Sequence, residues 1–188
     1  KLHESYLYNF KGDSVVRLSS DRGVATGFQI TAASGRQYTM TNRHVCDGLN
    51  NGKDYVSWDH GEDTGQLKIL YRDDTADLCL LEPISSIRAL SVAGSASARE
   101  SVYLVGHPAG RGLSFERGHL VEKTRISISN YCMHDSRFWC RYSYSSYHLN
   151  AISYGGNSGS PILNSFGNVV AVLFAGRRDQ PTASHSVP

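Results

Sequence analysis

Gly155-Gly156-Asn157-Ser158-Gly159-Ser160-Pro161 is the stretch of sequence from which the fold can be predicted. Small residues on both sides of Ser158 leave room for a tight backbone path and for a substrate carbonyl lying against the main chain. The N–H groups of Gly156 and Ser158 could form a two-donor oxyanion hole, which stabilises the charge that develops in acyl transfer. Ser160 is the competing nucleophile, but only Ser158 has glycines at both −2 and +1. A Gly/Ser/Asn cluster is equally typical of a surface turn, so the stretch needs partners elsewhere in the chain.

The first partner is His44, in Tyr38-Thr39-Met40-Thr41-Asn42-Arg43-His44-Val45-Cys46. A β-prone run leads into this histidine and a polar loop follows it. A histidine at the end of a strand is held by the scaffold while its ring faces a cleft, as a general base requires. The alternative is a buried, hydrogen-bonded histidine without a catalytic role.

The second partner is Asp77, which opens the short apolar run Leu78-Cys79-Leu80-Leu81. A carboxylate beside a buried strand is costly unless it is paired or hydrogen-bonded, and orienting an imidazole is one reason to keep it. The alternative is an aspartate that caps a turn, which suits Asp73 and Asp74 better.

Five segments, in this order, resemble the chymotrypsin-like (trypsin-fold) serine peptidases, nearest to the bacterial glutamyl endopeptidase and HtrA-type branches. They are Thr26-Gly27-Phe28, Thr41-Asn42-Arg43-His44-Val45, Ala76-Asp77-Leu78-Cys79-Leu80-Leu81, Val105-Gly106-His107-Pro108-Ala109-Gly110, and the Ser158 turn with Ile162-Leu163-Asn164. One such segment would be a weak signal, but five in sequence are highly specific.

The resemblance implies an all-β fold of two six-stranded antiparallel β-barrels, with the active site in the cleft between them. We expect residues 1–188 to form a single peptidase domain. Residues 1–94 would form the N-terminal barrel with His44 and Asp77, and residues 95–188 the C-terminal barrel with Ser158. The small, almost uncharged segment 93–98 is the best candidate for the connection between the barrels.

Short β-like runs separated by Gly, Asp, Asn and Ser agree with this fold class, and long helical periodicity is absent. The expected strands are Ser14–Leu18, Val24–Ile30, Arg36–Thr41, Asp54–Trp58, Gln66–Tyr71, Asp77–Glu82, Ser101–Val105, Leu113–Glu122, Arg125–Ser129, Arg141–Tyr144, His148–Ser153, Pro161–Leu163 and Val169–Ala175.

The resemblance also implies a serine endopeptidase that works through an acyl-enzyme. Ser158 would be the nucleophile, His44 the general base and Asp77 the residue that orients it, with Gly156 and Ser158 donating to the oxyanion. Substrate-binding residues would lie just before the serine and on the strand after it: Ile152, Ser153, Tyr154, Leu173, Phe174 and Ala175.

The specificity pocket differs from those of two branches of the family. Ile152 stands where trypsin-like enzymes carry an acid, and Leu173 where glutamyl endopeptidases carry a histidine. We therefore expect a modest preference for uncharged apolar P1 residues, because an apolar pocket discriminates by only about 1–3 kcal/mol per methylene.

Composition excludes other classes of partner. The net charge is +2, from 19 basic and 17 acidic residues, and gives no field that would favour nucleic acid. The longest apolar run, Val169 to Ala175, is too short to cross a bilayer, so we expect no membrane insertion. We expect no cofactor and no metal, and a protein or peptide as substrate.

Four cysteines allow three full pairings. Cys46 and Cys79 each follow a candidate site residue by two positions, and our default for them is a pair of buried free thiols. Cys132 and Cys140 could close a small loop by a disulfide, and a metal site with His134 between them matches no standard zinc spacing.

The termini suggest a fragment or trimmed domain. The chain opens without a signal peptide and without the Ile/Val-Val-Gly-Gly start of zymogen-derived trypsins, and the family's C-terminal helix does not follow residue 188. We therefore expect a missing flanking domain or precursor. The compartment stays open between a secreted or periplasmic location and release from a larger, possibly viral, precursor.

Three alternatives remain open: a catalytically silent binding module on the same fold, an esterase that acts on non-peptide acyl groups, and a self-processing polyprotein protease.

Overall fold

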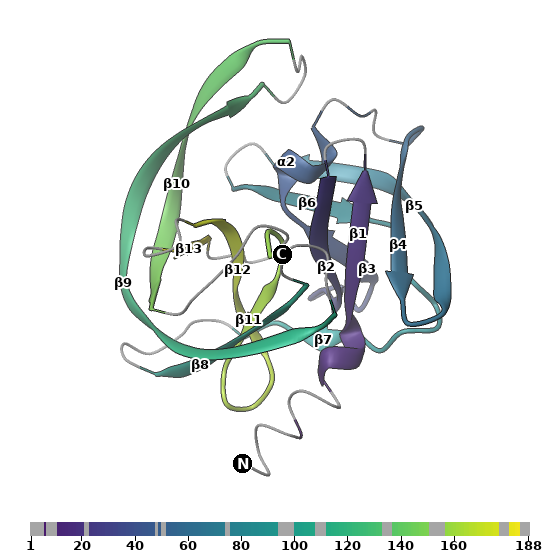
Figure 1. The fold of residues 1–188 in the computed structure, drawn as a ribbon, viewed down its shortest axis with the longest axis horizontal. Helices are drawn as coiled ribbons and strands as arrows, with labels where there is room; N and C mark the ends of the chain where they lie inside the picture. The colour runs from purple at the N-terminus through teal and green to yellow at the C-terminus, as the bar shows by residue number, and fades with distance from the viewer. Residues whose placement is uncertain are drawn as a thin grey trace.

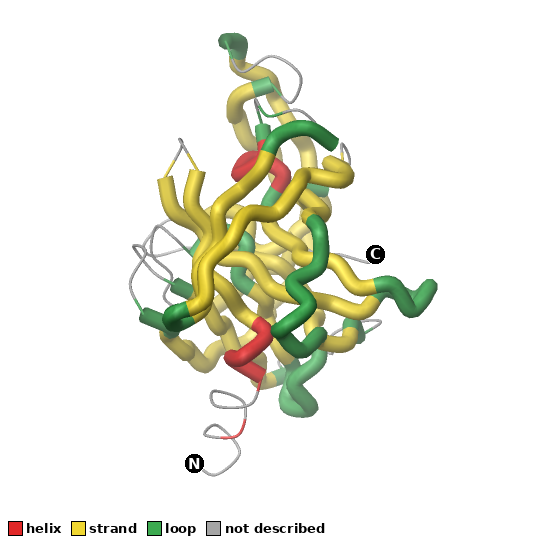
Figure 2. The backbone as a smooth tube through the Cα atoms, turned by 90° about the vertical axis from the view of Figure 1, so that its right-hand side faces the viewer, coloured by secondary structure: helices red, strands yellow, loops and turns green. Residues whose placement is uncertain are grey.

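The computed structural model describes residues 6, 11–20, 23–47, 49, 52–73, 76–93, 100–107, 112–132, 137–150, 157–176 and 181–184. Strands dominate this part of the chain, as the short β-like runs predicted, and the helical residues form only brief segments (Figure 2). None of the described helices has the length and apolar character needed to cross a membrane.

The first half of the chain forms a seven-stranded sheet in the order β1-β4-β5-β6-β3-β2-β7. The strands are β1 (Val15–Ser20), β2 (Gly23–Thr31), β3 (Gln37–Thr41), β4 (Tyr55–His60), β5 (Asp63–Asp73), β6 (Leu78–Leu81) and β7 (Leu90–Ser91). The pairings are antiparallel except that of β2 with β7. β1 pairs with β4 on one side and with β2 on the other, so the first strand of the order also meets the last but one.

The second half forms a closed barrel of six strands in the order β10-β13-β12-β11-β8-β9 (Figure 1). The strands are β8 (Ser101–Gly106), β9 (Ser114–Tyr131), β10 (Trp139–Asn150), β11 (Pro161–Leu163), β12 (Val169–Gly176) and β13 (Pro181–Ser184). The barrel expected for this half of the chain is confirmed.

Two strands are longer than predicted. β9 unites the runs expected at Leu113–Glu122 and Arg125–Ser129. β10 unites the run expected at Arg141–Tyr144 with the first residues of the run expected at His148–Ser153, of which residues 151–153 lie outside the described part of the chain. The two strands pair from Tyr131↔Trp139 to His119↔Asn150 with one register shift. The polar residues between the expected runs indicated a turn, but cross-strand pairing keeps them extended. The resulting hairpin curves well beyond the barrel (Figure 1).

One apolar cluster joins the two halves of the molecule. Phe28 and Leu78 of the sheet pack in the same buried cluster as Val105, Leu163 and Val172 of the barrel. A parallel bridge between Val92 and Val169 and the hydrogen bond from Ala93 N to Val169 O (2.8 Å) extend this contact. The halves therefore meet through a shared core, which fixes residues of one against residues of the other.

Candidate active site

His44 lies on a one-turn helix, α2 (Arg43–Cys46), that begins directly after β3. The expected strand Arg36–Thr41 ends where β3 ends, but His44, expected at the end of that strand, lies on the helix that follows it. The chain leaves the sheet through Asn42, which is extended at φ −75° and ψ 150°. The Asn42 Nδ2 group donates to the backbone oxygen of Asp77 at 3.0 Å, so the start of the helix is attached to the segment that carries the carboxylate.

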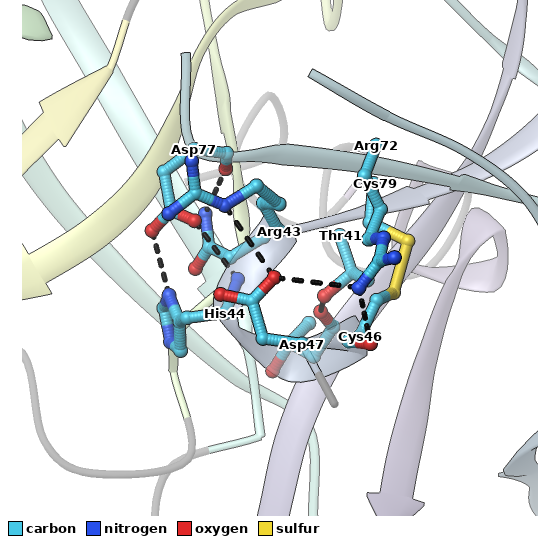
Figure 3. Close-up of a disulfide and its surroundings, with 10 residues drawn as sticks. Thr41, Arg43, His44, Cys46, Asp47, Arg72, Asp77 and Cys79 are labelled. Carbon is cyan, nitrogen blue, oxygen red and sulfur yellow. Dashed lines mark hydrogen bonds and ion pairs between the residues drawn. A yellow bond between two sulfur atoms is a disulfide. The ribbon is translucent and has the colours of Figure 1, made fainter. Parts of the chain in front are cut away.

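His44 and Asp77 are in direct contact, as Figure 3 shows. The imidazole Nδ1 is 2.6 Å from Asp77 Oδ2, and the backbone N–H of His44 donates to Oδ1 at 2.9 Å. Asp77 is 1% exposed, whereas the His44 side chain is 24% exposed. A buried carboxylate therefore holds Nδ1 while part of the ring remains accessible to solvent.

The pKa of His44 is raised above its ordinary value. Burial on its own lowers this pKa, because it disfavours the charged imidazolium. The charge of Asp77 and its hydrogen bond act in the opposite direction and prevail. The carboxylate thus stabilises the protonated ring, which is the state a general base passes through.

A disulfide joins Cys46 to Cys79, with the two Cα atoms 6.5 Å apart. Our prediction of free thiols at these positions was wrong. The residues lie two positions after His44 and two positions after Asp77, so the bond fastens α2 to β6 next to the His44–Asp77 contact (Figure 3). The matching offsets were visible in the sequence, but only the fold shows that they bring the two sulfur atoms together.

Cys132 and Cys140 also form a disulfide, with Cα atoms 4.9 Å apart. It closes the end of the β9–β10 hairpin, where Cys132 N also donates to Phe138 O at 2.9 Å. The described residues contain no cluster of side chains that could hold a metal ion.

The Ser158 turn is attached to the sheet through its backbone. Thr26 N on β2 donates to Ser158 O at 2.9 Å, and Thr41 Oγ1 at the end of β3 donates to Thr26 O at 2.8 Å. Gly159 has a φ of +89°, and a Cβ there would overlap Thr26 O and Thr41 Oγ1. The serine turn therefore lies against the strand end from which the chain continues to His44.

The structure describes some of the expected substrate-binding residues. Leu173 and Phe174 are buried on β12 at 3% and 2% exposure, and Ala175 follows them on the same strand. β12 runs beside the serine turn, because Gly159 N donates to Leu173 O at 2.8 Å and Leu173 N donates to Ser160 O at 3.0 Å. The residues expected before the serine, Ile152, Ser153, Tyr154 and Gly156, lie outside the described part of the chain.

Sequence reasoning missed a buried charge cluster beside His44. Arg43 Nε is 3.5 Å from Asp47 Oδ1, and Arg72 Nη1 is 3.8 Å from the same oxygen. Burial raises the pKa of Asp47, and the neighbouring Arg43 opposes that rise. The i,i+4 spacing of Arg43 and Asp47 was the available signal, but α2 was not expected.

A model of the family described as trypsin-like peptidase domain matches residues 25–172. Among curated proteins, the pro-apoptotic serine protease nma111 of Aspergillus terreus is 30% identical over 184 residues, covering 94% of this chain. The chain spans only 16% of the length of that protein.

Two solved structures share the fold. The active form of the Rv3671c protease from M. tuberculosis has a TM-score of 0.79 at 21% identity, covering 98% of this chain and 81% of that one. The serine endoprotease from Yersinia pestis has a TM-score of 0.71 at 15% identity, covering 97% of this chain and 62% of that one.

Proposed function

The chain belongs to the trypsin-like peptidase domain family of serine endopeptidases, and we propose that it hydrolyses peptide bonds through an acyl-enzyme formed on Ser158. The observation that carries this proposal is the contact of His44 Nδ1 with the buried carboxylate of Asp77 at 2.6 Å. It leaves Nε2 as the ring nitrogen that can exchange a proton with a nucleophile.

In the proposed reaction His44 takes the proton of Ser158 Oγ while that oxygen bonds to the scissile carbonyl carbon. The C–N bond then breaks, and His44 returns the proton to the leaving amine. A water molecule, deprotonated by the same imidazole, attacks the carbonyl carbon of the acyl-enzyme ester. The bond from that carbon to Ser158 Oγ breaks, the imidazolium returns the proton to Oγ, and the carboxylic acid product leaves. Asp77 keeps Nδ1 protonated and stabilises the imidazolium in both halves of the cycle.

The oxyanion would be held by the backbone N–H groups of Gly156 and Ser158. Attachment of Ser158 O to Thr26 N, at 2.9 Å, supports this role because it fixes the orientation of the turn. Small residues at 155, 156 and 159 leave the main chain accessible to a substrate carbonyl.

We propose a modest preference for uncharged apolar P1 residues. Leu173 and Phe174 are apolar residues of the strand hydrogen-bonded to the serine turn, and Ile152 and Tyr154 precede the serine. A peptide-library profile dominated by Lys, Arg or Glu at P1 would contradict this specificity.

The two-barrel description and the domain division are part of the proposal. β1 pairs with both β2 and β4, which supports a ring of six strands in residues 1–94. His44 and Asp77 would come from that ring and Ser158 from residues 95–188, with the active site in the cleft between them. The whole chain would then be one peptidase domain.

The proposed partner is a protein or peptide substrate, and the balanced charge of the chain favours no nucleic acid. Because the chain spans 16% of the length of its relative nma111, we also propose that it is released from, or works within, a longer protein.

Labelling with a fluorophosphonate tests the function directly. Ser158 Oγ displaces fluoride from phosphorus, so the wild-type protein takes one label at Ser158 and Ser158→Ala takes none. A folded wild-type protein that takes no label would be a binding module instead. An esterase would take the label without cleaving casein, and a self-processing protease would cleave only a longer precursor of its own chain.

A further inference from the structure

The residue that precedes His44, Arg43, is entirely buried. Its exposed fraction is 0%, and it is the largest of the fully buried side chains among the described residues. An arginine is almost never fully buried unless it is paired. Its position, on the first residue of the helix that carries the proposed base, raises the question of what it does there.

The ion pair with Asp47 does not by itself explain the burial of Arg43. Its Nε atom is 3.5 Å from Asp47 Oδ1, a long ion pair. Within the described part of the chain, Nε and Nη1 of Arg43 and both carboxylate oxygens of Asp47 lack hydrogen-bond partners. Replacing a buried ion pair by apolar residues of similar volume is often neutral or stabilising, so packing alone would favour a methionine or leucine here.

The guanidinium of Arg43 contacts the other half of the molecule. Its central carbon is 3.9 Å from the centroid of the Tyr142 ring on β10, a distance at which the cation is attracted to the π face. Arg43 is therefore a direct side-chain link between α2 and the barrel.

This link continues to the proposed substrate-binding strand. The Tyr142 ring stacks on Tyr144 with centroids 6.0 Å apart and planes at 7°. Tyr144 is 1% exposed and meets Phe174 of β12 edge to face at 5.4 Å. Four side chains in contact thus connect the helix of His44 with a predicted wall of the P1 pocket.

We propose that Arg43 is a positioning residue for the proposed reaction, holding α2 against β10 so that the base and the pocket wall keep a fixed relation. The inference rests on the proposed function, because it concerns the base of that reaction. Arg43 touches neither the substrate nor the reacting atoms and acts through His44 and Tyr142.

The charge of Arg43 gives the test a specific readout. Titratable or charged groups from four elements and their flanking turns face this region: Asp77 beside β6, Arg43 and Asp47 at α2, Arg72 on β5, and the phenols Tyr142 and Tyr144 on β10. Among these, the positive charge of Arg43 lowers the pKa of His44, opposing Asp77 and Asp47. Removing that charge should make His44 easier to protonate.

The experiment measures the second-order rate constant of fluorophosphonate labelling at Ser158 as a function of pH. For Arg43→Met we expect the rate constant on its high-pH plateau to fall about tenfold or more, since misplacement of a catalytic group by about 1 Å can slow a reaction about 100-fold. The acid limb, where the rate constant falls because His44 becomes protonated, should move to higher pH. The melting temperature should be unchanged or higher, because a buried ion pair adds little to stability. Arg43→Lys keeps the charge without the planar stack, so its plateau should fall while its limb stays in place.

Two further variants complete the design. Arg141→Met is the matched control, because Arg141 precedes Tyr142 on β10 but is exposed and donates to Ser127 Oγ at 3.2 Å. It should behave as wild type. Tyr142→Leu removes the aromatic partner of Arg43. The double variant should label no more slowly than Arg43→Met alone, as expected for two residues that act as a unit.

The outcomes separate this inference from the proposed function. Wild-type protein that is labelled at Ser158 supports the function whatever the Arg43 variants do. An Arg43→Met protein with the wild-type plateau and limb then overturns the inference alone. The inference is also overturned if labelling falls only in proportion to the amount of folded protein and the acid limb of the folded fraction stays at the wild-type pH. If Arg43→Met does not fold, Arg43→Lys decides through its plateau. Wild-type protein that takes no label overturns both.

Discussion

A substitution of Asp77 can change the orientation and tautomer of the His44 imidazole without unfolding the protein. Asp77→Asn keeps the shape of a side chain that is 1% exposed, so we expect the fold to remain. An amide can donate to Nδ1, which places the imidazole proton on Nε2 and blocks the ring from acting as base. Turnover should fall by on the order of 10⁴, as in the chymotrypsin-type example.

The measurement is kcat on a peptide substrate with phenylalanine at P1, with circular dichroism as the check on folding. Asp73→Asn is the control, because it makes the same change four positions before Asp77, at the last residue of β5. A kcat for Asp77→Asn within tenfold of wild type would remove Asp77 from the proposed mechanism.

The pH dependence of activity follows from the raised pKa of His44. Burial lowers this pKa, but the Asp77 carboxylate raises it by more, so the acid limb of kcat/KM should have its midpoint above about 6.5, the value for a free histidine. The ion pair's contribution to folding has the opposite trend. It is fully present below the unfolded-state pKa and is lost as pH rises through the folded-state pKa.

Activity should therefore increase over the pH range in which this contribution to stability disappears. A pH titration of kcat/KM, with urea unfolding at the same pH values, measures both. A limb at or below 6.5 would contradict the dominant role of Asp77.

At the scale of elements, the two disulfides should differ in what they control. The Cys46–Cys79 bond spans 33 residues and the Cys132–Cys140 bond spans 8. From loop-closure entropy, removing the first bond should lower the free energy of unfolding by about 3.7 kcal/mol, and removing the second by about 2.5 kcal/mol. Only the first bond fastens α2 to β6, so Cys46→Ser/Cys79→Ser should lose most of its activity and Cys132→Ser/Cys140→Ser should keep it.

Urea unfolding gives the stability of each variant, and fluorophosphonate labelling of the folded fraction gives its activity. Equal losses of activity in the two double variants would show that α2 does not depend on its disulfide.

Sequence patterns predict the bounds of the uniformly apolar strands closely. The runs at Pro161–Leu163 and Val169–Ala175 are uniformly apolar, as suits β11 and residues 169–174 of β12, which are buried, and the bounds of both strands match closely. The polar residues in the middle of β9 resemble a turn in the sequence, although they pair across the hairpin with β10. Helix α2 has only four residues, too few for any periodic signal, so the helical position of His44 could not be predicted.

At the scale of the whole molecule, the candidate site combines motifs that are local with contacts that are not. The segments around His44, Asp77 and Ser158 can each be recognised from the local sequence, and the resemblance to a known family predicts that they form one site. The Cys46–Cys79 bond and the stacking of Arg43 on Tyr142 join residues 33 and 99 positions apart. No local pattern encodes such contacts, because the disulfide depends on how α2 folds against β6 and the Arg43–Tyr142 contact depends on how the sheet and the barrel pack.

The two halves are in close contact at Gly159, and the last prediction concerns this position. Gly159 and Gly35 have similar φ angles of +89° and +85°, so an alanine at either position is strained by about 1–2 kcal/mol. A Cβ at Gly35 meets nothing within 4 Å, whereas one at Gly159 overlaps Thr26 O on β2 and Thr41 Oγ1 on β3. Overpacking of this kind costs typically a further 1–3 kcal/mol, about the same as the strain itself.

We therefore expect Gly159→Ala to lower the free energy of unfolding in urea by clearly more than Gly35→Ala does. Labelling of Ser158 in the folded fraction should also fall only for Gly159→Ala, because relief of the overlap moves the serine turn away from β2. Equal effects of the two substitutions on stability and labelling would mean that the turn and the sheet are not held together at this point.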